Sequence, residues 1–148
     1  MGNEERREIT RHALRITFWW LAVAAIAAWL LWMTLRPQEQ ASSDLTYITA
    51  PAAARGISIP FLIGFLGNIA VFVPLSAAVV FALANKPRGI RLLAATAVGA
   101  GLSAAIELLQ RMIPSRFSGF DDWLLNTLGT FIGAIVATIL IRRRDRHR

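Results

Sequence analysis

Residues 60–84 read PFLIGFLGNIAVFVPLSAAVVFALA, a run that contains no charged side chain. A helix of about 20 apolar residues crosses the hydrocarbon core of a bilayer. Three further stretches are long and apolar enough to do so: 18–35, 92–113 and 123–141. We therefore expect an all-α integral membrane protein, folded as a bundle of four transmembrane helices.

The composition supports a membrane protein over a soluble one. Of the 148 residues, 55% are hydrophobic and 17% are charged, whereas about one quarter of the residues in soluble domains are charged. The net charge is +7, but the basic residues sit in short blocks between apolar runs, as in cytoplasmic loops, so no nucleic-acid partner is expected. The absence of cysteine excludes disulfides and zinc–thiolate sites.

The basic blocks predict how the chain lies in the membrane. Most of the Lys and Arg residues fall in residues 1–17, in the loop 85–91 and in residues 142–148. By the positive-inside rule, these segments are cytoplasmic. We expect a multi-pass protein of the cell membrane, with a basic cytoplasmic N-terminal segment (1–17), a membrane domain (18–141) and a basic cytoplasmic tail (142–148).

Small residues and aromatics predict the packing of the helices. The stretch 92–113 is rich in Ala, Gly and Ser, which allow close approach, so we expect it at the centre of the bundle. The stretch 18–35 is rich in Trp and Leu and is expected at the periphery. Gly129 and Gly133 form a G-x-x-x-G pattern, which we interpret as intramolecular packing in preference to a dimer seam.

Two further features concern helix direction. A stripe of polar and small residues begins just before the predicted helix 123–141 and follows one face of it: Asp122, Asn126, Gly129 and Gly133. We expect this stripe to meet the small residues of 92–113. Pro74 cannot donate a hydrogen bond to the carbonyl of residue 70, so a kink is expected in 60–84. Two interpretations of this kink are open. It serves helix packing alone, or it also directs the outer half of the helix, with Asn68, toward the polar cluster.

Seven polar residues form a cluster near the expected outer face of the membrane. They are Asn68, Glu107, Gln110, Arg116, Asp121, Asp122 and Asn126. At a rise of 1.5 Å per residue, Asn68 lies about 12 Å and Glu107 about 9 Å inside the membrane. Ionisable residues at such depths are costly and point to a functional site. We predict an outward-facing polar pocket, with Glu107 as the candidate catalytic residue should there be catalysis.

Each member of this cluster also has a structural interpretation. Asn68 and Asn126 can act as hydrogen bonds between helices. Asp121 and Asp122 can cap the positive end of a helix. Glu107 can form a structural ion pair with Arg111 or Arg116, because a carboxylate inside a span needs a partner.

In order and spacing, these residues resemble the VanZ-like family. The resemblance rests on NIAVFVPL (68–75), ELLQ (107–110), Arg116, Asp121-Asp122 and NTLG (126–129), and it covers about residues 60–141. The family comprises small multi-pass membrane proteins, whose namesake is associated with resistance to the glycopeptide teicoplanin. The resemblance implies that the family's signature positions are Asn68, Phe72, Pro74, Glu107, Gln110, Arg116, Asp122, Asn126, Gly129 and Gly133. Two positions depart from the family pattern. Ser76 stands where members commonly have a Gly, and Gly119 stands where many members have an acidic residue.

Three classes of function remain open. The preferred one is a binding protein whose outer pocket takes a lipid headgroup, a cell-wall precursor or a glycopeptide antibiotic. The alternative is a membrane enzyme acting on a lipid-linked or headgroup substrate, with Glu107 as acid or base and Asp121 and Asp122 as weak candidates for a divalent cation. A transporter is disfavoured, since no inverted repeat is visible. No cofactor is expected, and the oligomeric state and the role of loop 38–59 stay open.

Overall fold

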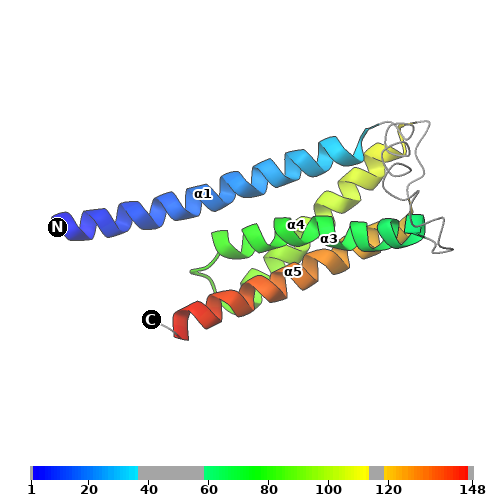
Figure 1. Ribbon diagram of the computed structural model, residues 1–148. Helices are drawn as coiled ribbons and strands as arrows, with labels where there is room; N and C mark the ends of the chain where they lie inside the picture. Colours follow the sequence, from blue (N-terminus) through cyan, green and yellow to red (C-terminus); the bar gives the residue numbers. More distant parts are fainter. Residues whose placement is uncertain (1, 37–58, 114–118, 147–148) are drawn as a thin grey trace.

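The computed structural model describes residues 2–36, 59–113 and 119–146, which form long helices (Figure 1). They are α1 (Asn3–Thr34), α3 (Ile59–Ala82), α4 (Arg88–Gln110) and α5 (Phe120–Arg146). All four are long and apolar enough to cross a membrane. The expected all-helical architecture with four candidate spans is therefore confirmed.

Two helices extend well beyond the apolar stretches that predicted them. α1 begins at Asn3 instead of near residue 18, and α5 continues through the basic residues to Arg146. Arg and Glu are good helix formers, so a helix need not end where its apolar run ends. The boundaries of α3 and α4 differ from the predicted ones by up to four residues.

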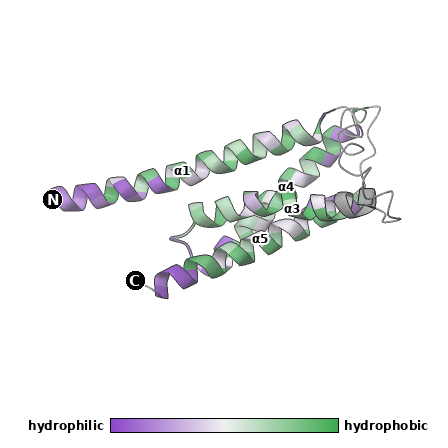
Figure 2. Cartoon of the chain, in the orientation of Figure 1, coloured by the Kyte–Doolittle hydropathy of each residue, from purple (hydrophilic) through white to green (hydrophobic). Residues whose placement is uncertain are grey.

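The basic segments gather at one end of the bundle. The start of α1, the turn between α3 and α4 and the end of α5 lie together in Figure 1. Figure 2 shows hydrophilic residues at both termini and hydrophobic residues along the middle of the helices. We call this the basic end. The distal end holds the ends of α1 and α4 and the starts of α3 and α5.

The central helix is α3, not the small-residue stretch 92–113 as expected. α3 packs on α1, α4 and α5, with its largest interface on α5, whereas α4 barely touches α1. Phe72, Leu75 and Val79 of α3 are buried in the core. Small residues permit close approach without requiring it on every side, and Ala97 and Gly101 of α4 are exposed.

α1 is peripheral, as predicted. Leu30 is its buried residue, packing with Phe72, Leu75 and Ile106. Nearer the basic end, Trp19 stacks on Phe81 with ring centroids 4.6 Å apart. The remaining surface of α1 is largely exposed, as suits a helix that faces lipid.

The predicted α5 stripe meets α4 only in part: Asn126 bonds to Ser103 of α4, whereas Gly129 and Gly133 meet α3, which corrects the partner expected for the glycines. A methyl group on Gly129 would overlap the carbonyl of Ile69, and one on Gly133 would overlap Val73 and Ser76. The glycines therefore serve packing within the chain. α4 approaches α5 through Gly99, which faces Thr130. The stripe lies between two neighbours, so one side of it faces α3 and the other side faces α4.

Pro74 lies on the exposed side of α3, and the helix continues through it. The neighbouring Ser76 is fully buried, and its hydroxyl donates to the carbonyl of Val73 over 3.0 Å. Ser76 also contacts the α5 backbone region at Gly133. The segment around the proline is thus held against α5.

Candidate functional site

Asn68 and Asp122 join α3 to α5 at the distal end. The Asn68 Nδ2 donates to Asp122 Oδ1 over 2.6 Å. Asp122 lies in the first turn of α5, where the helix dipole favours a negative charge. The amide and the helix terminus therefore both stabilise this carboxylate. Asp121 precedes it and is exposed.

Asn126, one turn further along α5, faces α4. Its Nδ2 donates to the Ser103 hydroxyl over 2.9 Å, and both residues are buried. The Oδ1 of Asn126 is buried without a hydrogen-bond partner in the described part of the chain. Its backbone carbonyl accepts a hydrogen bond from Thr130. Asn126 thus links the two helices and retains one unused acceptor.

Trp123 contributes a contact that sequence reasoning missed. Its indole Nε1 donates to the carbonyl of Ala100 over 3.1 Å. A tryptophan at the start of a membrane helix usually signals an interface anchor, which hid this role. The usable signal was the small residue Ala100, because a helix backbone is accessible to a partner's side chain only where its own side chains are short.

Glu107 lies one turn beyond Ser103 on the same side of α4 and is only 7% exposed. The backbone N–H of Gly119 donates to its carboxylate, and Asp122 and Arg111 are close enough to act on it electrostatically. Its Oε2 is buried and has no hydrogen-bond partner among the described residues. Burying an unpaired carboxylate oxygen is costly, so this atom is a prime candidate for a ligand contact.

Glu107 lines a pocket of about 290 Å³ between the end of α4 and the start of α5. We call it the distal pocket. Its lining comprises Ala104, Glu107, Leu108, Arg111, Gly119, Phe120 and Trp123. Phe120 and Trp123 pack together with ring centroids 5.3 Å apart. Two charged side chains among apolar and aromatic walls suit an amphiphilic ligand.

Gln110 lies apart from this pocket. It is buried, and its Nε2 donates to the backbone carbonyl of Thr34 over 2.9 Å, which ties the end of α4 to the end of α1. The carbonyl groups of a helix's last turn lack intrahelical partners, so this bond also completes α1. Gln110 therefore serves the join between α1 and α4.

Of the seven predicted site residues, four gather at the junction of α3, α4 and α5. They are Asn68, Glu107, Asp122 and Asn126. Gln110 bonds to α1 and Asp121 is exposed, and Arg116 lies outside the described residues, so its pairing with Glu107 stays a prediction. Within the described ranges, no group of three or more His, Cys, Asp or Glu side chains is placed to hold a metal ion. The cation role of Asp121 and Asp122 also stays a prediction.

The fold and the buried polar junction define a class: a small multi-pass helical membrane protein. The model of the VanZ/LLP1 family matches residues 18–141, which is most of the chain. The chain therefore belongs to the VanZ/LLP1 family, and the resemblance seen in the sequence is confirmed. Searches of curated proteins and of solved structures found no significant match.

Proposed function

We propose that the distal end faces the outside of the cell and that the distal pocket binds an amphiphilic component of the envelope. Candidates are a lipid headgroup, a cell-wall precursor or a lipophilic glycopeptide. The orientation rests on the positive-inside rule, since the basic segments share the opposite end of the bundle. At this depth, polar headgroups meet acyl chains, which matches the mixed lining of the pocket.

The observation that carries this proposal is Glu107, a residue that lines the distal pocket and whose buried Oε2 has no hydrogen-bond partner among the described residues. A ligand that donates a hydrogen bond or carries an amine would satisfy this oxygen. Leu108, Phe120 and Trp123 supply apolar contacts beside it. Arg111 on the rim adds a positive charge for an acidic group of the same ligand.

Susceptibility to glycopeptides tests the proposal most directly. Expression of this chain in a sensitive host should lower the susceptibility to teicoplanin more than it lowers the susceptibility to vancomycin. Glu107→Gln should remove most of this protection. The amide keeps the size of the side chain but loses the charge and one acceptor. Membrane abundance of both forms is measured and matched.

Asp121→Asn is the comparison variant, because it removes the same charge at an exposed position of the distal end. We expect it to lose much less protection than Glu107→Gln. Equal protection by the wild type and Glu107→Gln would indicate that Glu107 has a structural role and does not bind the ligand. Absence of protection by the wild type would separate this chain from the antibiotic phenotype.

The enzymatic alternative is favoured by one observation, the proximity of Glu107 to Asp122. Two carboxylates of different surroundings can divide acid and base roles. In that case, envelope lipids of cells expressing the wild type should carry an altered headgroup that is absent with Glu107→Gln. Unchanged lipid composition alongside protection would favour binding.

A further inference from the structure

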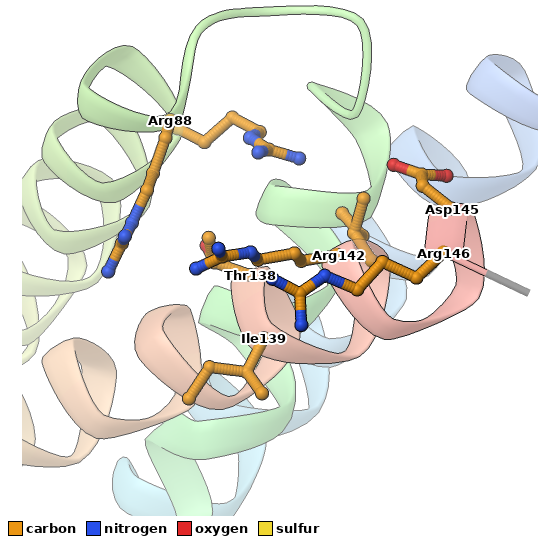
Figure 3. A pocket seen from close by; sticks show the side chains of 8 residues that line it. Arg88, Thr138, Ile139, Arg142, Asp145 and Arg146 are labelled. Atoms are coloured by element: carbon orange, nitrogen blue, oxygen red, sulfur yellow. The ribbon is translucent and has the colours of Figure 1, made fainter.

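A second pocket, of about 310 Å³, opens at the basic end between the start of α4 and the end of α5. Its polar lining comprises Arg88, Arg91, Thr138, Arg142, Asp145 and Arg146. Figure 3 shows Arg142 and Arg146 extending beside Thr138, with Arg88 reaching across from α4. Four arginines from two helices thus surround one opening, which we call the basic pocket.

Buried polar atoms in the basic pocket lack partners. The Oγ1 of Thr138 is buried without a hydrogen bond in the described part of the chain, and the residue is only 4% exposed. Thr127 and Thr130, earlier in α5, donate instead to the carbonyl four residues back. The Nε and one terminal nitrogen of Arg91 are likewise buried and unpartnered among the described residues.

These atoms require an acceptor that the described chain does not supply. Buried guanidinium nitrogens without a partner cost considerable free energy. The lining has one acidic residue, Asp145, against four arginines, and Asp145 also lines a neighbouring pocket with Arg15 and Arg144. The basic pocket therefore retains an excess of positive charge and several unused donors.

We propose that the basic pocket binds a phosphate group, carried by an anionic membrane lipid or free in solution. Arginine recognises phosphate by paired hydrogen bonds, and Arg88, Arg91 and Arg142 are placed to supply them. The N-terminus of α4 begins at Arg88 and adds free N–H groups with the positive end of its dipole. Thr138 donates its hydroxyl to the same anion. Basic pockets between transmembrane helices are suited to lipid headgroups.

Native mass spectrometry of the purified full chain in detergent measures this binding. Phosphatidylglycerol should bind more tightly than zwitterionic phosphatidylcholine. Arg91→Gln should weaken phosphatidylglycerol binding about tenfold, the effect of losing one charge-assisted hydrogen bond. Thr138→Val keeps the shape of the side chain and should weaken it about fivefold, in line with one neutral hydrogen bond.

Arg143→Gln is the charge control for Arg91→Gln, because Arg143 is an exposed arginine at the same end of the bundle, next to Arg142 on α5, and does not line the basic pocket. We expect it to change binding less than about twofold, as for other exposed charges. In a second arm, inorganic phosphate is tested for thermal stabilisation of the lipid-free chain. One outcome is that phosphate stabilises the wild type but not Arg91→Gln while no lipid is preferred. That result would identify free phosphate, and not a lipid headgroup, as the ligand.

Equal losses from Arg91→Gln and Arg143→Gln would overturn the proposal, since they would indicate general attraction to the basic end. Binding of neither phosphatidylglycerol nor phosphate above the phosphatidylcholine level would overturn it as well. Circular dichroism shows whether each variant is folded. If Arg91→Gln unfolds, Thr138→Val decides alone, because its buried volume is unchanged.

Discussion

At the scale of single residues, three amide side chains each make a hydrogen bond between helices. Asn68 donates to Asp122, Asn126 to Ser103, and Gln110 to the backbone of Thr34. Each bond joins a different pair of helices. The interpretation of amides as contacts between helices thus describes all three. It also fits with a functional role for Asn126, which keeps an unused buried acceptor.

The bond between Asn68 and Asp122 should contribute measurably to stability. We expect a double-mutant cycle of Asn68→Ala and Asp122→Ala to give a coupling energy of about 1 kcal/mol, a typical value for hydrogen bonds between membrane helices. The free energy of unfolding in mixed detergent and SDS micelles measures it. Additive effects of the two substitutions would show that the bond contributes no coupling energy, which would contradict the prediction.

At the scale of elements, the interface between α3 and α5 depends on the absence of side chains. Gly129 and Gly133 lie against the α3 backbone at Ile69 and Val73. Ser76, which lies against Gly133, departs from the glycine common in the family, yet its hydroxyl fits by donating to the carbonyl of Val73. A tight contact between α3 and α5 therefore lies within two to three turns of Asp122, in the same helix.

Gly129→Ala should separate these helices and destabilise the protein by about 1–3 kcal/mol, as overpacking does. Gly101→Ala is the matched control, because Gly101 is an exposed helical glycine with open space around its Cα. That substitution should be neutral or slightly stabilising, since alanine favours helices. Detergent unfolding of both variants measures the difference. Equal stability of the two would contradict the tight contact at Gly129.

At the scale of the whole molecule, the bundle has two chemically different ends. The basic pocket lies at one and the distal pocket at the other, separated by an apolar middle (Figure 2). With the bundle across a membrane, the two pockets would lie near opposite faces of that membrane. Ligands bound at the two ends would be chemically distinct: an amphiphile near Glu107 and a phosphate near Arg91.

The proposed orientation can be measured with single cysteines, because the chain has none of its own. Lys86 and Asp121 are exposed at opposite ends of the bundle. Asp121→Cys in intact cells should react with a membrane-impermeant maleimide, and Lys86→Cys should react only after permeabilisation. The positive-inside rule predicts this result. The reverse pattern would place the distal pocket on the cytoplasmic side.

The apolar runs of the sequence were sufficient to predict the four helices, and the Trp- and Leu-rich composition of 18–35 was sufficient to predict the peripheral place of α1. This prediction succeeds because a membrane helix forms its backbone hydrogen bonds within itself and needs an apolar run of a set length. Both requirements can be read from the residues of one segment. The tertiary structure alone decided that α3 is central, that Gly129 and Gly133 meet α3, and that Gln110 bonds to α1. A small-residue face suits several neighbours equally, and lipid supplies no hydrophobic preference among them, so only side-chain fit selects the partner.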